Sequence, residues 1–288
     1  MKRITSRQNP LVRLLRQLAR ARAADETAIV LDGAHLVGEA LSAGLRVRVV
    51  AVSDAIAASD EGRRLLDGAR EAGADVVTAA GDILDLMSPT ETPSGVVGVA
   101  DAAAWALPAA LDRRPALVLA AVDVQEPGNA GAIVRAADAS GASAVVFCGA
   151  SADPFGWKAL RGSMGSAFRV PLVRRVAVEA LIDGCRQRGI RTWATIPRGG
   201  TGLFEADLRG PTCVLLGGEG GGLGPDVATR ADGRLTIPMR QGVESLNVAV
   251  AAALAGYEAF RQREHARPPA PAGGATARQA SGGRHGRT

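Results

Sequence analysis

Six short apolar runs recur between residues 117 and 239, and segments with helical spacing separate most of them. Strands buried on both faces of a sheet are nearly continuous apolar runs, and intervening helices let successive strands pair in parallel. The pattern therefore predicts an α/β fold with a mostly parallel sheet covered by helices on both faces. The expected strands are LVLAAV at 117–122, SAVVFC at 143–148, FRVPLV at 168–173, RTWATI at 191–196, CVLLGG at 213–218 and RLTIPM at 234–239.

Residues 1–100 alternate shorter strands and helices, which predicts a second, smaller α/β domain. Asn9 and Pro10 are favoured residue types at the N-cap and first position of a helix expected over 9–22. Residues 101–114 have no strong period and predict a linker, which leaves 115–264 for the larger domain. In the smaller domain, further helices are expected at 34–42, 61–72 and 83–87, and strands at 28–33, 46–53, 74–80 and 94–100.

The charges are unevenly distributed along the chain. The net charge is +5, yet the first 22 residues hold seven basic and no acidic side chains, and the last 28 hold six arginines and one glutamate. Basic termini on a mildly acidic body favour a polyanionic partner, because phosphate neutralisation supplies affinity that is independent of sequence. Charged termini that serve only solubility would show the same pattern. Residues 265–288 contain little to bury and predict a disordered basic tail.

Several absences from the sequence narrow the function classes. No apolar run approaches the roughly 18 residues that a membrane span needs, and no apolar segment typical of a secretory signal follows the basic N-terminus. We therefore expect a cytoplasmic protein. The cysteines and histidines lack the spacing of metal ligands, so no metal site is predicted, and the three cysteines are expected to be buried free thiols. These residues are Cys148, Cys185, Cys213, His35, His265 and His285.

The segment PALVLAAVDVQEPGNAGAIVRAADASGASAVVF, residues 115–147, predicts a compact βαβ unit. Asn129 is expected to cap its helix, and Arg135 is expected to reach back over Gly131, because helical side chains lean toward the N-terminus. Free N–H groups and the helix dipole favour an anion there. The structural alternative is that Asn129 is only a cap and Arg135 only pairs with Asp138.

The segment CVLLGGEGGGLGPD, residues 213–226, places five glycines around Glu219 directly after an apolar strand. Glycine lets the backbone approach a ligand closely and adopt positive φ. No Gly-Lys-Ser/Thr follows, and no Gly-x-Gly-x-x-Gly register fits, which argues against a P-loop and against a Rossmann nucleotide enzyme. A plain turn is the structural alternative, although a carboxylate within it has no evident structural purpose.

The segment RLTIPMRQGVESLNVAVAAALAGYEAFRQR, residues 234–263, predicts a strand, a loop and a helix. Ser245 is expected to be the N-cap, and the helix is expected to be buried nearly all round because alanine and valine dominate its faces. Capping does not explain Glu244 and Asn247. Polar groups at a buried helix start need partners, and a bound ligand is one candidate.

These three segments together resemble the SpoU (TrmH) family of RNA ribose 2'-O-methyltransferases, within the trefoil-knotted SPOUT superfamily. Each motif alone is weak, but their order, spacing and strand-to-loop context are specific, and the resemblance covers about 115–264. Residues 1–100, with ITSRQNPLVRLLRQL and LDGAHLVGEAL, more loosely resemble the small α/β ribosomal-protein-like domain that binds RNA substrates in such enzymes. Asp32 stands there where that family more often has Glu.

The resemblance implies S-adenosyl-L-methionine as cofactor, a homodimer with the site completed across its interface, and structured RNA, above all 23S ribosomal RNA, as substrate. The positions that match its catalytic motifs are Asn129, Arg135, Glu219, Ser245 and Asn247. The cofactor is expected to contact Thr195, Gly217, Gly218, Ile237 and Leu246. From their charge, RNA contacts are expected at Arg3, Arg7, Arg13, Arg16, Lys158 and Arg161.

Arg135 is expected to bind a phosphate and act electrostatically rather than as a general base, because a guanidinium with a pKa above about 12 is effectively never deprotonated in proteins. Two alternatives stay open for the whole chain. It can act on transfer RNA, or it can be an RNA-binding protein that retains the fold without catalysis. The sequence does not distinguish housekeeping modification from antibiotic self-resistance.

Overall fold

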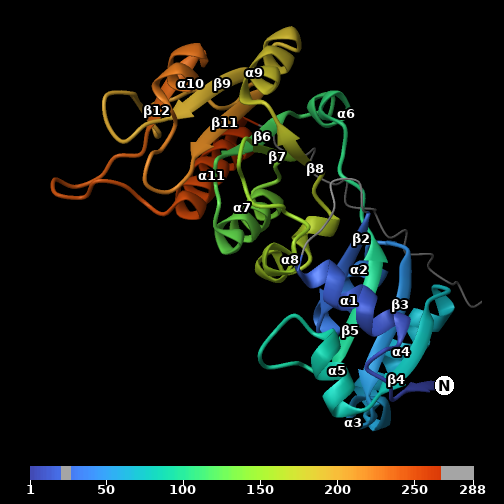
Figure 1. The fold of residues 1–288 in the computed structure, drawn as a ribbon. Coiled ribbons are helices and arrows are strands. Elements are labelled where there is room, and N and C mark those ends of the chain that lie inside the picture. Colours follow the sequence, from blue (N-terminus) through green and yellow to red (C-terminus); the bar gives the residue numbers. More distant parts are fainter. Residues whose placement is uncertain (21–26, 267–288) are drawn as a thin grey trace, which may run out of the picture.

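A computed structural model of the chain describes residues 1–20 and 27–266. The expected basic tail lies outside the described residues, apart from its first two positions. The described strands form two sheets, one five-stranded and one seven-stranded, which Figure 1 shows as two separate layers joined end to end. No helix within the described ranges is long and apolar enough to cross a membrane.

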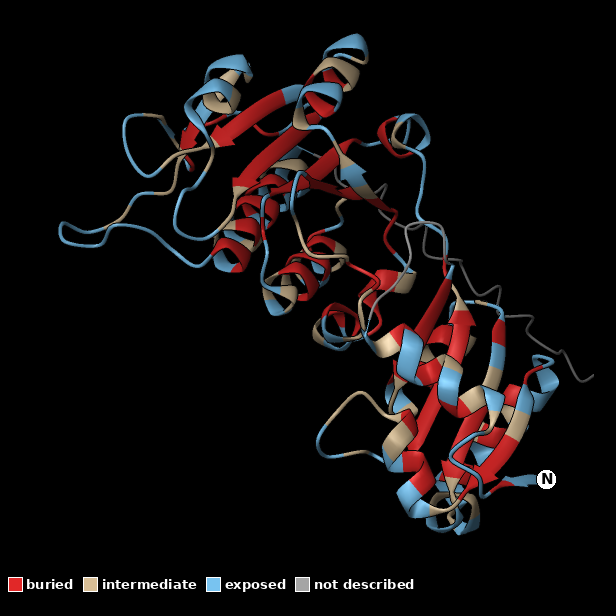
Figure 2. Ribbon diagram, in the orientation of Figure 1, coloured by how far each residue is buried: buried red, intermediate tan, exposed pale blue. Residues whose placement is uncertain are grey.

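The seven-stranded sheet is parallel throughout, as the sequence predicts, in the order β10-β12-β9-β11-β6-β7-β8. Two adjacent strands, Leu117–Val122 and Ala144–Cys148, are apolar and buried at every position, which is typical of a sheet covered on both faces. Figure 2 shows this burial along the strands. The bounds are β6 Leu117–Val122, β7 Ala144–Cys148, β8 Leu172–Val176, β9 Arg191–Thr195, β10 Thr201–Gly202, β11 Thr212–Gly217 and β12 Gly233–Thr236.

Helices cover both faces of this sheet, and each face has its own apolar cluster. One face is covered by α7 Pro127–Ala139, α8 Trp157–Ser163 and α11 Val248–Ala266. The other is covered by α6 Leu107–Leu111, α9 Val178–Gln187 and α10 Pro225–Arg230. Strand order reverses between β6 and β11, so the loops that follow these two strands flank a topological switch point, where open α/β sheets bind ligands.

The five-stranded sheet is mixed, in the order β1-β4-β3-β5-β2, with β5 antiparallel to both of its neighbours. Its strands are β1 Lys2–Ile4, β2 Ala28–Asp32, β3 Val47–Ser53, β4 Asp75–Ala79 and β5 Val96–Asp101. Its helices are α1 Pro10–Arg20, α2 Ala34–Ser42, α3 Asp54–Ala58, α4 Asp60–Glu71 and α5 Gly81–Met87. Helices α1 and α5 pack on one face, and α2 and α4 pack on the other.

Several sequence-based expectations for the fold differ from the structure. The strand expected at 234–239 lies at Gly233–Thr236. The strand expected at 168–173 lies at Leu172–Val176, and a 3-10 turn, η1, occupies Ser166–Phe168 instead. Pro171 has no N–H to give to a strand ladder, so the strand begins after it. The expected linker at 101–114 contains α6, which buries Ala110 and Leu111 against the larger sheet.

Candidate active site

A cleft of about 620 Å³ lies at the carboxyl ends of the parallel strands. Three loops supply its walls: the loop after β9, the glycine loop after β11, and the loop between β12 and α11. All five residues expected to hold the cofactor line this cleft, namely Thr195, Gly217, Gly218, Ile237 and Leu246. The sequence did not single out Ile196, Pro197 or Met239, which also line it. Their position at the carboxyl end of a predicted strand, or directly after it, was the available signal.

The glycine loop needs its glycines for close backbone packing. A Cβ on Gly218 would lie 2.0 Å from the carbonyl oxygen of Asp123, and one on Gly217 would lie 2.2 Å from a backbone carbon of Gly222. Gly220 and Gly222 adopt positive φ, a conformation that side chains disfavour. The loop is therefore held against the end of β6, and Glu219 is placed at its exposed tip beside the start of α7.

Three motif residues that are far apart in the sequence form one hydrogen-bonded chain. The Asn129 amide donates from Nδ2 to Oε1 of Glu219, and its Oδ1 accepts from Nδ2 of Asn247 at 3.0 Å. This chain joins α7, the glycine loop and the start of α11. Because each polar group uses a directional bond, the side chains are held in fixed orientations at the edge of the cleft.

Two of the three predicted helix caps are wrong, whereas Asn9 accepts from the Leu11 N–H at the start of α1 as expected. Glu126 caps α7, and Asn129 lies within its first turn, which frees the Asn129 side chain for Glu219 and Asn247. Asn247, not Ser245, caps α11, because its Oδ1 accepts from the backbone N–H groups of Ala249 and Val250. Ser245 lies in the preceding loop and lines the cleft together with Glu244.

Arg135 is exposed on α7 and makes no hydrogen bond or ion pair with any described residue. The structural alternative for it is wrong, because Asp138 pairs instead with Arg169, at 2.8 Å. Gly131 does not leave open space beneath Arg135, since a Cβ there would lie 2.3 Å from the carbonyl oxygen of Ala159 in α8. Gly131 is therefore a helix-packing position, and the Arg135 guanidinium is available to a ligand.

The outer face of α11 is exposed, so the expectation that this helix is buried nearly all round is wrong. Val250, Leu254, Tyr257 and Phe260 are 48%, 38%, 50% and 43% exposed, respectively. The opposite face is built from small residues and packs on α7 and β11; a Cβ on Gly256 would lie 2.5 Å from Oγ of Ser140. Four large apolar side chains on one exposed stripe mark a surface that needs a partner.

The residues expected to contact RNA lie in two places, four in the N-terminal domain and two on α8. Arg3 and Arg7 form exposed ion pairs with Asp54 and Asp82, whereas Arg13 and Arg16 are exposed on α1 and have no ion-pair partner among the described residues. Lys158 and Arg161 are exposed on α8, and Lys158 lies over the half-buried Trp157 ring.

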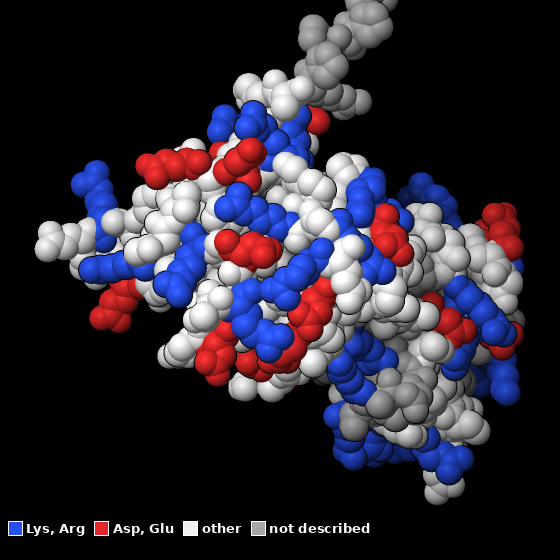
Figure 3. Space-filling view, turned by 90° about the horizontal axis from the view of Figure 1, so that it is seen from above, with Lys and Arg blue, Asp and Glu red and all other residues white. Residues whose placement is uncertain are grey.

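Acidic and basic side chains are interspersed over much of the face shown in Figure 3. That face therefore does not present a surface of one charge sign.

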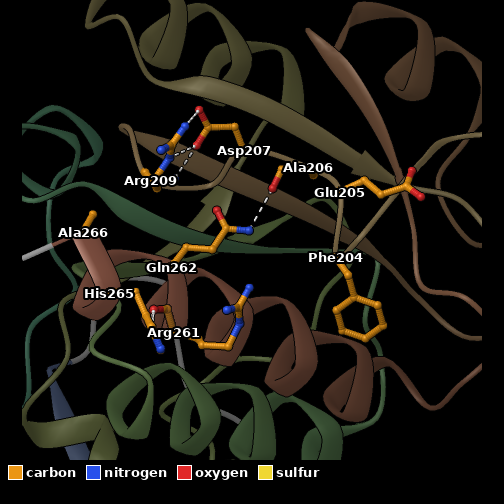
Figure 4. Close-up of a pocket in the computed structure, with 9 residues that line it drawn as sticks. All are labelled: Phe204, Glu205, Ala206, Asp207, Arg209, Arg261, Gln262, His265 and Ala266. Carbon is orange, nitrogen blue, oxygen red and sulfur yellow. Dashed lines mark hydrogen bonds and ion pairs between the residues drawn. The ribbon is translucent and has the colours of Figure 1, made fainter.

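A second hollow, of about 380 Å³, lies at the C-terminal end of α11 and gathers none of the sequence motifs. Figure 4 shows two polar contacts in this hollow: Arg209 pairs with Asp207, and Gln262 donates to the Ala206 carbonyl, whereas Glu205 points away from them. The exposed Phe204 lies at its edge. This hollow is a surface depression in which Arg209, Asp207 and Gln262 already hydrogen-bond within the protein.

The cysteines are buried free thiols, as expected. Burial, with a smaller contribution from the charge of Asp123, raises the pKa of the Cys148 thiol to about 12, so it stays protonated and unreactive. No group of three or more potential metal-ligating side chains occurs among residues 1–20 and 27–266.

Residues 116–257 match the SpoU rRNA Methylase family, and residues 9–98 match the MRM3-like substrate binding domain. The 23S rRNA (guanosine(2553)-2'-O)-methyltransferase RlmP of Bacillus subtilis is 31% identical, over 89% of this chain and 98% of RlmP. The SpoU methyltransferase AviRb of Streptomyces viridochromogenes, solved in complex with AdoMet, superposes with a TM-score of 0.81 at 30% identity, over 89% of this chain and 99% of that chain. The AdoMet-bound rRNA methyltransferase of Sinorhizobium meliloti gives a TM-score of 0.80 at 28% identity, over 90% and 97%. With its three motifs gathered at one cleft, the chain belongs to the SpoU family of RNA methyltransferases.

Proposed function

We propose that this protein transfers a methyl group from S-adenosyl-L-methionine to the ribose 2'-hydroxyl of a nucleotide in structured ribosomal RNA. The observation that carries the proposal is the hydrogen-bonded chain of Asn129, Glu219 and Asn247, which unites the three family motifs beside one cleft. RlmP supports the choice of 23S rRNA by its name, and AviRb supports the choice of cofactor by its complex with AdoMet.

The residues of the cleft fit the proposed cofactor. Ile237 and Leu246 offer apolar surface for an adenine ring, and the peptide groups of the glycine loop offer donors and acceptors for the polar groups of the cofactor. A volume of about 620 Å³ is in the range of small-molecule sites. S-adenosyl-L-methionine would supply, when bound, a methyl group bonded to a positively charged sulfur, which leaves as a neutral thioether when the methyl group is transferred.

Arg135 is proposed to bind a phosphate of the RNA next to the target ribose. Its guanidinium is exposed, has no partner among the described residues, and lies on the same helix as Asn129. A planar guanidinium binds two phosphate oxygens at once, which fixes both the position and the orientation of the nucleotide. Arg135 then contributes by alignment and by electrostatic stabilisation, without losing a proton.

We propose that a carboxylate accepts the proton of the ribose 2'-hydroxyl. Among the described residues, Glu219 and Glu244 are the two carboxylates that line the cleft. Of these, Glu219 is already held by Asn129, so its position is the better defined. Asn247 and Ser245 complete the polar rim and orient the ribose.

We also propose that the protein is a homodimer in which the exposed face of α11 forms the interface. Val250, Leu254, Tyr257 and Phe260 cover successive turns of that face, and the last two rings meet edge to face with centroids 6.3 Å apart. The same face begins next to Leu246 and the cleft. A partner subunit on this face would therefore lie beside the methyl-transfer site and can complete it.

Three finer assignments rest on the family and are proposals here. The loops that converge on the cleft, 195–197, 217–223 and 237–247, are proposed to make up a trefoil knot. The five-stranded domain is proposed to be a ribosomal-protein-like module that binds RNA, and tracing both domains in a crystal structure tests these two assignments. A ribosomal substrate places the protein in the cytoplasm.

The direct test incubates purified protein with methyl-labelled S-adenosyl-L-methionine and ribosomal RNA, digests the RNA to nucleosides, and identifies the product by mass spectrometry. The proposal expects a labelled 2'-O-methylribonucleoside from ribosomal RNA and little label in transfer RNA. Label confined to transfer RNA would show that transfer RNA, and not ribosomal RNA, is the substrate. RNA binding without cofactor binding or label would make the chain a non-catalytic binding protein.

A further inference from the structure

One arginine bridges the two domains and also contacts the helix that carries the site residues. Arg169 donates from Nε to Oδ2 of Asp138 at 2.9 Å and from Nη1 to a carboxylate oxygen of Glu39. Asp138 lies on α7, and Glu39 lies on α2 of the N-terminal domain. The guanidinium thus holds two carboxylates from different domains, in the forked geometry that arginine provides.

The turn that precedes Arg169 packs closely against Glu39. Gly165 has φ +87, and a Cβ there would lie 2.4 Å from Oε2 of Glu39, so a larger residue would strain the turn that ends α8 and displace the Glu39 carboxylate. Nη2 of Arg169 also donates to Oγ of Ser166 at 3.3 Å, within the same turn. Burial disfavours the charged guanidinium, but its hydrogen bonds to Asp138 and Glu39 and the charges of these carboxylates more than offset that effect and raise the pKa of Arg169.

The bridge lies on a continuous apolar junction. A single cluster of buried residues includes Leu36 and Ala40 of α2 as well as Leu160 of α8 and Val170. Figure 1 shows α8 beside α2 and β2, at the place where the two sheets meet. On the linker side, the N–H of Trp105 donates to the carbonyl of Leu172, three residues after Arg169. The apolar cluster and the hydrogen bond from Trp105 to Leu172 therefore both hold the two domains together.

We propose that Arg169 is a positioning residue that fixes the orientation of the N-terminal domain relative to α7, and so presents RNA bound by that domain to the methyl-transfer site. The inference rests on the proposed function for its RNA. Asp138 lies three residues, about one helical turn, after Arg135, so the bridge ends close to the proposed phosphate-binding arginine. When two sites on one chain hold one substrate, a fixed geometry raises the effective concentration of the reacting group at the second site.

The energetics favour an orienting role over a folding role. The side chains of Arg169, Glu39 and Asp138 are 46%, 28% and 25% exposed, and ion pairs at such positions contribute modestly to stability. Reversing the charge of Arg169 would instead set three carboxylates against one another at the junction, and juxtaposed like charges across an interface are strongly unfavourable. R169E is therefore expected to loosen the domain orientation and to leave each domain folded.

The variants for the test are R169E, the double variant E39R/R169E and the control R209E. The double variant restores an opposite-charge pair between positions 39 and 169, which is the pair that crosses the domain boundary. R209E reverses an exposed arginine that pairs with Asp207 away from the junction. Spin labels at Arg64→Cys in α4 and Ala180→Cys in α9 report the distance between domains, and both positions are exposed. The native cysteines are buried and should escape labelling. Diluting labelled with unlabelled protein suppresses distances between protomers.

Electron–electron double resonance should show one narrow distance distribution for the label pair alone, a broadened distribution with R169E, and a narrow one again with E39R/R169E. Steady-state assays should show that R169E raises KM for ribosomal RNA by about tenfold, while kcat at saturating RNA and the Kd for S-adenosyl-L-methionine change by less than about twofold. R209E should match the native protein in all four quantities.

An unchanged distance distribution in R169E would overturn the proposal, as would a broad distribution that the double variant fails to narrow. A loss of cofactor affinity and of melting temperature in step with kcat would reduce Arg169 to a folding residue and would also overturn it. The distance measurement needs no methylation, so a protein that methylates no RNA would refute the proposed function and still leave this test of the bridge decisive.

Discussion

The two sheets differ in strand direction. This difference matches the proposed division of roles, with methyl transfer at the seven-stranded sheet and RNA binding at the five-stranded one. The seven-stranded sheet is parallel throughout, so its carboxyl strand ends meet at one edge and the loops there build the cleft. In the five-stranded sheet, β5 runs antiparallel to β2 and β3, which sends its strand ends to opposite edges. That domain instead offers exposed arginines on α1. A parallel sheet gathers side chains at one place, whereas a mixed sheet of this kind supplies a surface.

Replacing Arg135 tests the catalytic side of this comparison most severely. Removing a group that stabilises transition-state charge costs about 10²–10³ in kcat, so Arg135→Ala is expected to lose that much while cofactor affinity stays unchanged. Arg135→Lys should recover little, because an ammonium cannot bind phosphate through two parallel bonds. Single-turnover rates and cofactor titration measure both quantities. If Arg135→Lys kept most of the turnover with native RNA affinity, the specific guanidinium role would be wrong.

The two carboxylates of the cleft are expected to differ. Glu219→Gln keeps a carbonyl oxygen for the Asn129 amide but removes the charge, so it should lower kcat by about 10². Glu244→Gln is the matched control and should retain most activity. Single-turnover rates measure both variants. A Glu219→Gln variant that keeps the native kcat would exclude Glu219 as the acceptor.

The outer face of α11 is a third surface, on the catalytic domain but outside the cleft. Leu254→Arg places a charge in the centre of the proposed interface and is expected to give a monomer with reduced activity. Gln17→Arg adds the same charge on an exposed position of α1 and should leave the oligomeric state unchanged. Sedimentation velocity distinguishes the two. A native protein that sediments as a monomer at micromolar concentration would contradict the dimer proposal.

The smallest effects are expected on the attachment side. Arg13→Ala and Arg16→Ala should each weaken RNA binding without changing kcat, and each should reduce the slope of log affinity against log salt by about one. Arg3→Ala should have less effect, because Arg3 already pairs with Asp54. Binding titrations at several salt concentrations measure the slopes. Equal slopes for native protein and the α1 variants would remove this domain's arginines from the RNA interface.

The sequence was sufficient to predict the strands and helices that periodic apolar residues indicate. It was not sufficient to predict features that depend on contacts between residues far apart in the chain. Periodicity predicted the parallel sheet and the apolar strands, and β6 and α2 lie at their expected bounds. It misplaced the strand near Pro171, where one missing N–H outweighs an apolar run. It also gave the wrong environment for α11, because an alanine-rich helix has the same pattern whether one face or all faces are covered.

The site divides in the same way. Residue types and their family spacing selected Asn129, Glu219 and Asn247, which the structure brings into hydrogen-bond contact. The caps of α7 and α11 were misassigned because a side chain that hydrogen-bonds across the fold cannot be recognised from its neighbours in sequence. The bridge formed by Arg169 was invisible for a related reason, since its partners Glu39 and Asp138 lie 130 and 31 residues away.

Methylation of 23S ribosomal RNA is most directly tested by mapping ribose 2'-O-methylation in total RNA from cells with and without the gene, using resistance of the methylated linkage to alkaline cleavage. We predict that one site in 23S ribosomal RNA loses its methyl group in the deletion strain, that the native gene restores it, and that Arg135→Ala does not. A methylation pattern identical with and without the gene, together with purified protein that fails to bind S-adenosyl-L-methionine, would show that the protein is not this methyltransferase.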